Sequence, residues 1–324
     1  MRKRQRGPRP VSDEPLSAGR VEYLEQARER VRNRRIRRTA LIVVALTLVV
    51  LFTTGIVGSS VAMAKDWADT ARCAEMRTPE GQKRAADVCR KHGIDGLVVI
   101  GGDGSFAGAQ KLAALGINTV GVPGTIDLDI ACTEYTIGFD TAVNTAMEAI
   151  DKVRDTSTSH ERCSIIEVMG RNAGYIALWC GIANGAEDIL LPEKYDYDEQ
   201  KIINNIIENR RKGKKHHIIV NAEGIGHSTS MARRIEAATG IETRATILGH
   251  MQRGGSPTCK DRVYASIMGA YAVDLLLEGK TDRVVAYKNG EYVDYDIDEA
   301  LSMTKTLPEY QWEIARALSY NYTK

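Results

Sequence analysis

The chain has 324 residues, of which 43% are hydrophobic and 27% charged, and its formal net charge is +2. That composition is ordinary for a globular protein of one or two domains with a sizeable core. The charge is uneven, because residues 1–38 carry 13 Lys and Arg against 5 Asp and Glu, and the remainder carries 31 against 37. The acidic remainder argues against a nucleic-acid-binding protein and marks residues 1–38 as a separate basic head.

Residues 39–64 contain no charged side chain and are strongly apolar. Since about 20 residues of helix span the hydrocarbon core of a bilayer, this stretch predicts a single-pass membrane anchor, followed by a junction over residues 65–70. The arginine-rich flank predicts a cytoplasmic N-terminus, with the remainder of the chain across the membrane. A signal peptide is an alternative, because Ala62-Met63-Ala64 fits the small-x-small cleavage pattern, and a buried core helix is another.

Strands and helices alternate from residue 80 onward. The apolar run Gly96-Leu97-Val98-Val99-Ile100 is bounded by glycines, as is typical of a buried parallel strand. Such alternation predicts βαβ units in an α/β fold, with a largely parallel sheet covered on both faces. The predicted helices lie at 80–92, 105–115, 140–156, 175–183 and 198–211, and the predicted strands at 96–100, 117–122, 163–169, 189–191 and 217–221.

The cysteines stand singly, without a C-x-x-C pair or regular spacing. This pattern predicts free thiols in a reducing compartment, mostly buried and chemically idle. The six are Cys73, Cys89, Cys132, Cys163, Cys180 and Cys259.

A glycine-rich motif, Gly101-Gly102-Asp103-Gly104-Ser105, directly follows a predicted strand and opens a predicted helix. Glycines let the backbone approach a phosphate, the helix N-terminus offers free N–H groups, and a neighbouring carboxylate can hold Mg²⁺. The alternative is a tight glycine turn without a ligand.

A second loop, Pro123-Gly124-Thr125-Ile126-Asp127-Leu128-Asp129, also follows a predicted strand. Its two carboxylates suit a general base and an orienting or metal-linked partner, although a plain polar loop is the alternative. Because ligands gather at the carboxyl edge of open α/β sheets, two such loops on one edge favour a site.

Arginines and a histidine recur in three later loops, Ser159-His160-Glu161-Arg162, Met169-Gly170-Arg171 and Gly249-His250-Met251-Gln252-Arg253-Gly254-Gly255. Guanidinium groups match phosphate oxygens in pairs, so their recurrence indicates a phosphorylated substrate. A single arginine of this kind is more often a surface charge, and a single histidine such as His250 is most often structural.

These motifs, in this order, resemble bacterial ATP-dependent phosphofructokinase over residues 71–324. The resemblance extends to Thr70-Ala71-Arg72-Cys73, Pro79-Glu80-Gly81, Tyr135-Thr136-Ile137-Gly138-Phe139-Asp140 and Ala222-Glu223-Gly224. It implies parallel sheets flanked by helices in two similar subdomains. It also implies a cytoplasmic glycolytic kinase that transfers phosphate from ATP to fructose 6-phosphate.

The resemblance assigns the reaction centre. Asp127 would be the general base for the 1-hydroxyl of fructose 6-phosphate, with Thr125, Asp129 and Arg171 in the same catalytic set, and Asp103 would bind Mg²⁺. The residues that would line ATP are Arg72, Cys73, Gly102, Asp103, Gly104 and Ser105. Those that would contact the sugar phosphate are Thr125, Asp127, Arg162, Met169, Gly170, Arg171, Glu223, Arg244, His250 and Arg253, with Arg162 and Arg244 reaching over from a neighbouring subunit.

The resemblance also implies regulation and assembly. The family is usually a homotetramer, and its effector is a nucleoside diphosphate or phosphoenolpyruvate. The effector site would map to Arg154, Gly185, Ala186, Glu187, Lys212, Lys214, Lys215 and His216. Pyrophosphate-dependent relatives typically carry Asp at the position of Gly104 and Lys at that of Gly124, so this chain resembles the ATP-using branch.

The chain departs from the family pattern in two places. The family's first strand and its Gly-Gly-Asp-x-Pro-Gly-x-Asn loop, which cradles ATP phosphates, do not appear before residue 70. Their loss would expose sheet edge and apolar surface. Leu128 stands where the family has Asn between the two aspartates. A catalytically incompetent chain, membrane-tethered or misjoined, is therefore the alternative to an active kinase.

Overall fold

The computed structural model describes residues 74–194 and 198–318. The predicted head, membrane span and junction, together with Arg72 and Cys73, lie outside these residues. Within the described ranges, no helix has the length and apolar character needed to cross a bilayer.

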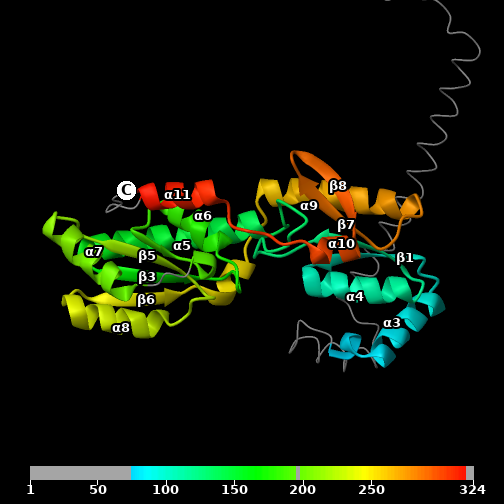
Figure 1. The fold of residues 1–324 in the computed structure, drawn as a ribbon, viewed down its shortest axis with the longest axis horizontal. Coiled ribbons are helices and arrows are strands. Elements are labelled where there is room, and N and C mark those ends of the chain that lie inside the picture. Colours follow the sequence, from blue (N-terminus) through cyan, green and yellow to red (C-terminus); the bar gives the residue numbers. More distant parts are fainter. Residues whose placement is uncertain (1–73, 195–197, 319–324) are drawn as a thin grey trace, which may run out of the picture. The chain divides into compact units, whose positions relative to one another are not determined.

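The first sheet has the strand order β1-β2-β7-β8 (Figure 1). β1 and β2 are parallel, with Gly101 opposite Pro123, so the loops that follow them leave from the same edge. β8 is antiparallel to β7 and returns through Asn289 and Gly290, both at positive φ. The strands are β1 (Gly96–Gly101), β2 (Asn118–Pro123), β7 (Arg283–Lys288) and β8 (Glu291–Asp296).

The second sheet is parallel throughout, in the order β4-β5-β3-β6. Every residue of β5 is buried, as expected of a strand inside a sheet covered on both faces. The strands are β3 (Cys163–Val168), β4 (Asp188–Leu190), β5 (His217–Ala222) and β6 (Thr243–Ile247).

Helices cover the first sheet on both faces. The start of α3 is set by Thr78, whose Oγ1 accepts a hydrogen bond from the Gly81 N–H at 3.1 Å, and by Pro79 at the first helical position. Apolar side chains of α4 and α10 pack in one core cluster with β7, and those of α9 in another. The helices are α3 (Pro79–Lys91), α4 (Asp103–Ala114), α9 (Cys259–Leu277) and α10 (Ile297–Ser302), with a 3₁₀ helix η1 (Ala74–Arg77) before them.

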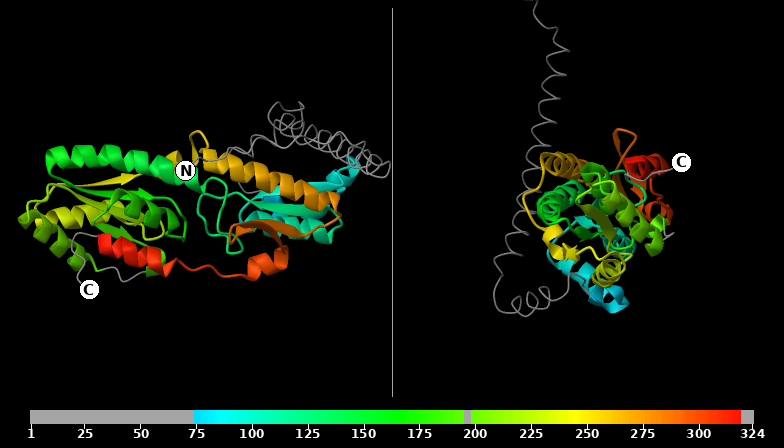
Figure 2. Two further views of the ribbon diagram at one scale, coloured as in Figure 1. Left: turned by 90° about the horizontal axis from the view of Figure 1, so that it is seen from above. Right: turned by 90° about the vertical axis from the view of Figure 1, so that its left-hand side faces the viewer.

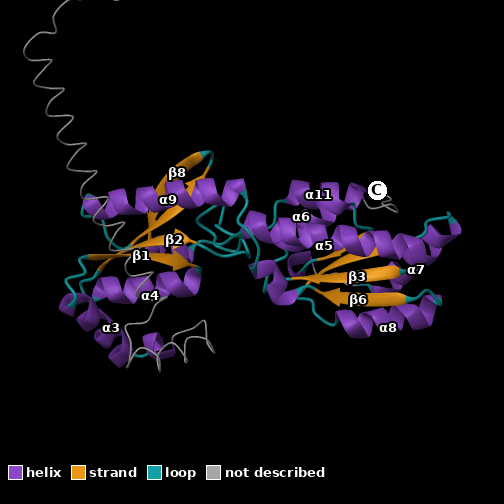
Figure 3. Ribbon diagram, turned by 180° about the vertical axis from the view of Figure 1, so that it is seen from behind, coloured by secondary structure: helices purple, strands orange, loops and turns teal. Residues whose placement is uncertain are grey.

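The second sheet is also flanked by helices, with α5 and α8 on opposite sides of β3 and β6 (Figure 3). The start of α5 meets the start of α9 (Figure 2), where the Thr258 N–H donates to Thr141 Oγ1 at 3.1 Å. The helices are α5 (Phe139–His160), α6 (Tyr175–Asn184), α7 (Glu199–Arg211), α8 (Ser228–Thr239) and α11 (Glu309–Leu318), with 3₁₀ helices η2 (Pro192–Lys194) and η3 (Gly249–Arg253).

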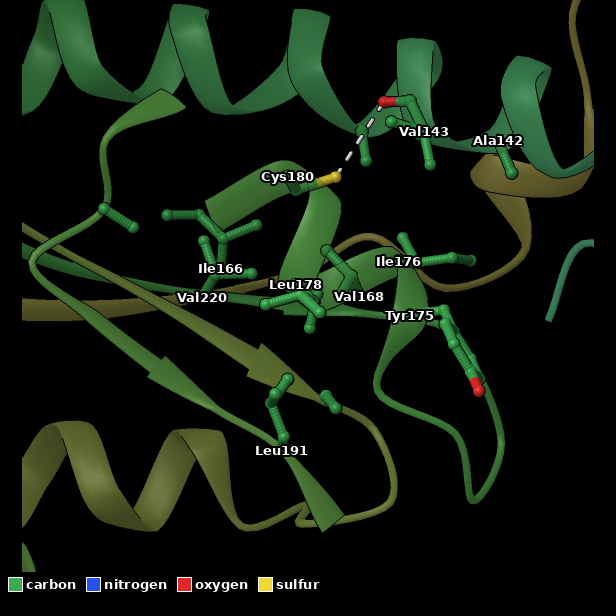
Figure 4. Packing of buried hydrophobic residues seen from close by; sticks show 14 of the residues in the cluster. Ala142, Val143, Ile166, Val168, Tyr175, Ile176, Leu178, Cys180, Leu191 and Val220 are labelled. Carbon is green, nitrogen blue, oxygen red and sulfur yellow. Dashed lines mark hydrogen bonds between the residues drawn. The ribbon is translucent and has the colours of Figure 1, made fainter. Parts of the chain in front are cut away.

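Alternate residues of the second sheet enter different cores. Ile165 and its register partner Ile219 pack with α7 and α8, whereas Ile166 and its partner Val220 pack with α5 and α6. Figure 4 shows the cluster that includes α5 and α6, in which Cys180 Sγ lies 3.9 Å from the Val143 carbonyl oxygen. Because successive side chains of a strand point to opposite faces, β3 contributes apolar residues to both cores.

The predicted α/β fold is confirmed, with each predicted helix and strand within a few residues of its observed bounds. The described cysteines are free, as predicted, and four of the five are buried, whereas Cys259 is exposed. Within the described residues β1 lies at the sheet edge, and Ile100 on it is 68% exposed. Among the described strands, β1 is therefore an edge strand that carries an exposed apolar side chain.

Candidate active site

The glycine motif and the aspartate loop lie side by side at the carboxyl edge of the first sheet. Gly101 ends β1 and Gly124 follows β2, and the Gly124 N–H donates to the Gly101 carbonyl at 3.0 Å. Asp103 begins α4 one residue after Gly102, which is the N-cap. The prediction that both loops project from one edge is confirmed.

Open space borders the backbone of the glycine motif. A Cβ added at Gly102 or Gly104 would meet no atom within 4 Å, whereas one at Gly101 would overlap the Ser105 side chain. The first turn of α4 thus presents backbone that a phosphate can approach, next to the free N–H groups of a helix N-terminus. Close packing against Ser105 requires glycine at position 101, whereas Gly102 and Gly104 leave the adjacent space unfilled.

Asp127 is half-buried in the second loop, where its N–H donates to Thr125 Oγ1 at 3.2 Å. Burial raises the pKa of the Asp127 carboxyl, and the negative charges of Asp129 and Glu223 raise it further. Arg253 and Arg171 act in the opposite direction. The carboxylate therefore lies among two acids and two arginines, which is the environment of a tuned acid–base group.

Asp103 belongs to the same electrostatic group. Partial burial and the charge of Asp129 raise its pKa, and Arg171 lowers it. Within residues 74–194 and 198–318, no three His, Cys, Asp or Glu side chains gather into a metal cage. Magnesium is commonly held by one or two carboxylates plus substrate phosphates, so Asp103 beside open backbone fits that ion.

The loop after β3 meets the loop after β5 through Glu223. The N–H of Gly170 donates to Glu223 Oε1 at 3.3 Å, and the N–H of Arg171 donates to the same oxygen. Gly170 has a φ of 147°, and a Cβ there would overlap the Ala173 carbonyl oxygen. The Arg171 side chain is exposed, and the turn that carries it is fixed by these two hydrogen bonds to the Glu223 carboxylate.

The loop after β6 forms the 3₁₀ helix η3 and completes this side of the site. Its start is tied to β3, because the Leu248 N–H donates to the Glu167 carbonyl at 3.0 Å. His250 and Arg253 are exposed on η3, whereas Gln252 between them is buried. Charged side chains from the ends of β2, β3, β5 and β6 therefore surround Asp127.

A model of the phosphofructokinase family matches residues 59–276. This chain belongs to the phosphofructokinase family. Curated relatives named ATP-dependent 6-phosphofructokinase include those of Clostridium botulinum (strain Loch Maree), 58% identical, and Clostridium tetani, 57% identical. The two matches cover 77% and 78% of this chain, respectively, and 78% of each relative.

Solved phosphofructokinase structures have the same fold. That of Saccharomyces cerevisiae aligns with a TM-score of 0.63 at 30% identity, over 77% of this chain and 36% of the yeast chain. The Pichia pastoris enzyme in the T-state aligns with a TM-score of 0.66 at 32% identity, over 77% of this chain and 30% of the Pichia chain. The chain thus spans about a third of the length of these yeast chains. A pyrophosphate-dependent phosphofructokinase from Marinobacter aquaeolei shares the fold alone. It is 24% identical, and it aligns with a TM-score of 0.65 over 72% of this chain and 66% of that one.

Leu128 differs from the family pattern in chemistry and keeps an unusual backbone. Its φ is 56°, a left-handed conformation that Asn tolerates better than a branched apolar residue. Its side chain is only 6% exposed and packs in the core cluster with Phe139 and Leu307. The apolar residue is therefore accommodated by burial, while its backbone retains the conformation suited to Asn.

Two predicted substrate residues lie away from the Asp127 group within one chain. Arg162 precedes β3 and Arg244 lies near the start of β6, at the amino ends of these strands. Both pair with Glu242, at 2.6 Å from Arg162 and 2.7 Å from Arg244. Because Met169 and η3 follow the opposite ends of the same strands, one chain does not bring these arginines to Asp127.

The predicted effector residues lie together near the start of β5. Glu187 is buried, accepts a hydrogen bond from the Ile218 N–H at 2.6 Å and pairs with Lys214. Burial lowers the pKa of His216, Glu187 raises it, and Lys214 and Arg154 lower it. The remaining members are Gly185 at the end of α6, the buried Ala186, Lys212 after α7, and Lys215, which lines a small cavity with Lys214 and His216.

Sequence reasoning assigned no role to two buried polar residues near the site. Gln252 lies between His250 and Arg253 in the glycine-flanked motif, and nothing in that motif distinguishes it from an exposed polar residue. Asp261 lies in the first turn of α9 and accepts hydrogen bonds from the Tyr135 hydroxyl at 2.6 Å and the Gly138 N–H at 2.7 Å. The one available signal was its place three residues after Thr258, as in a capping box.

Proposed function

We propose that this chain transfers the terminal phosphoryl group of ATP to the 1-hydroxyl of fructose 6-phosphate. The observation that carries the proposal is Asp127, held among Asp129, Glu223, Arg171 and Arg253 beside the open glycine turn. Membership of the phosphofructokinase family and relatives named ATP-dependent 6-phosphofructokinase support it.

Asp127 acts as the general base. Its raised pKa makes the carboxylate a stronger proton acceptor than an ordinary aspartate, and the 1-hydroxyl proton moves to its oxygen as the hydroxyl attacks the γ-phosphorus of ATP. The bond from that phosphorus to the β–γ bridging oxygen breaks, and ADP leaves with the bonding electrons. Thr125 holds the loop by accepting the Asp127 N–H. Asp129 raises the pKa of both Asp127 and Asp103, so its charge acts on the proposed base and on the proposed magnesium ligand.

The arginines bind phosphate groups. Arg171 acts on the charges of Asp127 and of Asp103, so it lies where the sugar and the nucleotide meet. There it offsets the charge that develops on the transferred phosphoryl group. Arg253 and His250 on η3 bind the 6-phosphate, together with Met169, Gly170 and Glu223. Arg162 and Arg244 join them from a neighbouring subunit in the proposed homotetramer.

The nucleotide phosphates lie against Gly102, Gly104 and Ser105 at the start of α4. Mg²⁺, held by Asp103 and the phosphates, supplies charge neutralisation when bound. Gly104 leaves room for ATP in this turn, and a Cβ at Gly124 would approach Ile100 Cγ2 to 2.8 Å. Glycine at both positions is also the pattern of the ATP-using branch that the chain resembles, which supports ATP rather than pyrophosphate as the donor.

A coupled assay on the full chain in detergent, with ATP, Mg²⁺ and fructose 6-phosphate, tests the proposal. Turnover that is lost in Asp127→Ala and kept in Asp95→Ala, an exposed aspartate before β1, supports it. Absence of turnover in the unaltered chain overturns it. Replacing ATP by pyrophosphate in the same assay tests the donor, and pyrophosphate use would overturn that part alone.

A second candidate function, a non-enzymatic member of the family, is favoured by one observation. β1 lies at the edge of the first sheet among the described strands, with Ile100 exposed beside the glycine turn. By resemblance, the family's own first strand and phosphate loop supply one wall of the nucleotide site, and a chain without that wall would not be expected to turn over ATP. Binding of fructose 6-phosphate without turnover is the outcome expected of that candidate.

Regulation, assembly and location are further parts of the proposal. The charged cluster of Glu187, Lys214, His216 and Arg154 suits an anionic effector such as a nucleoside diphosphate or phosphoenolpyruvate. Calorimetric titration with each compound tests this, and sedimentation tests the tetramer. The catalytic part is proposed to lie in the cytoplasm, and external protease digestion of sealed spheroplasts would contradict that location.

A further inference from the structure

Lys305 lies in the segment that joins α10 to α11, between residues 303 and 308. On one side, Ile297 and Ala300 of α10 pack in the core cluster with α4. On the other side, Leu307 and Ala315 pack in the cluster of α5 and α6. The segment is therefore anchored at both ends by buried apolar side chains.

The Lys305 ammonium is directed into the aspartate loop. Its Nζ donates to the carbonyl oxygens of Leu128 at 2.8 Å, Thr133 at 2.9 Å and Ile130 at 3.3 Å. An ammonium group has three protons, so three carbonyls account for all of them. One side chain thus gathers three points of a loop that lies more than 170 residues earlier in the chain.

The aspartate loop needs such support. Residues 124–138 contain no helix or strand, yet they carry Thr125, Asp127 and Asp129. Leu128, between the two aspartates, has a φ of 56°, which an L-residue with a branched side chain adopts at a cost. Because its carbonyl accepts the Lys305 proton, the same hydrogen bond restrains the strained residue.

The surroundings of Lys305 act on its charge in opposite directions. Its Nζ lies 5.2 Å from the centre of the Tyr175 ring, and the Tyr175 hydroxyl donates to the neighbouring Thr306 carbonyl at 3.1 Å. Figure 4 shows Tyr175 at the border of the buried cluster. Burial lowers the pKa of Lys305 to about 8, while Asp129, Cys132 and Glu134 favour its charged form. The Lys305 ammonium group therefore has the Tyr175 ring on one side and acidic side chains nearby.

We propose that Lys305 is a positioning residue, which fixes the backbone between Asp127 and Thr133 so that the base meets the sugar hydroxyl in the reactive geometry. This inference rests on the proposed phosphoryl transfer. Lys305 itself contacts the loop through carbonyl oxygens, and its effect on the reaction passes through Asp127. A displacement of about 1 Å in a catalytic group can reduce a rate about 100-fold.

The test compares Lys305→Met with Lys280→Met, a half-exposed lysine that pairs with Glu278 at 3.3 Å. Amide hydrogen exchange of the full chain is followed in peptides covering residues 125–134 and, as an internal reference, β5. The coupled assay then gives kcat and KM for fructose 6-phosphate. Should Lys305→Met fail to fold, Lys305→Gln, which keeps two N–H donors, takes its place under the same criteria.

In Lys305→Met we expect exchange in residues 125–134 to rise at least about tenfold with little change in β5. We expect kcat to fall about 100-fold while KM changes less than about threefold. Unchanged exchange in the loop, an equal rise in β5, or an effect on KM alone would overturn the assignment. Because exchange requires no turnover, an inactive unaltered chain would refute the proposed function while exchange still decides on Lys305.

Discussion

The N–H of Met169 donates to Oε1 of Gln252 at 2.7 Å, which joins the loop after β3 to the 3₁₀ helix after β6. Gln252 is 1% exposed, and its Nε2 has no hydrogen-bond partner among the described residues. This buried link sets the spacing between the turn that carries Arg171 and the helix that carries His250 and Arg253. The proposed sugar-phosphate site is thus held together by a residue that need not touch the sugar.

Gln252→Ala removes the acceptor that faces Met169. We expect the KM for fructose 6-phosphate to rise about tenfold, since one lost hydrogen bond of roughly 1.4 kcal/mol corresponds to that factor. Steady-state kinetics with saturating ATP measure it. Met251→Ala, at an exposed position of the same 3₁₀ helix, serves as the control, and an unaltered KM in Gln252→Ala would contradict the role given to this link.

Glu223→Gln changes the pH dependence of the proposed reaction. Glu223 contributes to the raised pKa of Asp127, so removal of its charge lowers that pKa. A general base works when deprotonated, and its rate falls as pH drops through its pKa. We therefore expect the acid limb of kcat to move to lower pH in this variant. A pH–rate profile measures the shift, and no movement, or movement toward higher pH, would show that the Glu223 charge does not raise the pKa of Asp127 as described.

Leu128→Ala tests how the aspartate loop is attached to the core. The Leu128 side chain is buried in the cluster with Phe139 and Leu307, so its truncation is expected to cost about 2–3 kcal/mol. The left-handed φ is not relieved by Ala. Urea unfolding measures the loss. Val88→Ala, 53% exposed on α3, is the matched control, with an expected change below about 0.5 kcal/mol.

Asp261→Asn tests the junction of α5 and α9. Asp261 accepts from the Thr141 N–H at 2.9 Å and from the Gly138 N–H, and an amide would place a donor against one of these donors. We expect a loss of about 3 kcal/mol, measured by urea unfolding at pH 7. Asp87→Asn, at an exposed ion pair with Arg90, is expected to change stability by less than about 0.5 kcal/mol.

The effect of Asp261→Asn also depends on pH in a defined direction. Burial alone would raise the pKa of Asp261, but hydrogen bonds from Thr141, Tyr135 and Gly138 outweigh it and lower the pKa. A lowered carboxyl pKa contributes stability above the unfolded value, and that contribution is lost as pH falls through the folded value. The stability difference between the two proteins should therefore shrink in acid, as the pH falls below the ordinary aspartate pKa of 3.8.

Sequence reasoning located the elements and the loops of the site correctly, because both depend on local patterns. The apolar run at 96–100 became β1, and the two glycine and aspartate motifs lie at adjacent strand ends. Arg162 and Arg244, by contrast, lie at the opposite end of their strands from Met169. A motif's position in the chain does not reveal which sheet edge its side chains reach, so these residues could be assigned to the site only by resemblance.

The amino-acid sequence by itself determined the α/β alternation, the glycine turn and the identities of the charged side chains near Asp127. Only the tertiary structure showed the buried polar contacts that hold them, because their partners are distant in the chain. Asp261 meets Tyr135 across 126 residues, and Lys305 meets Leu128 across 177. No periodicity spans such separations. The cost of leaving a buried donor or acceptor unpaired selects these contacts once the chain has packed.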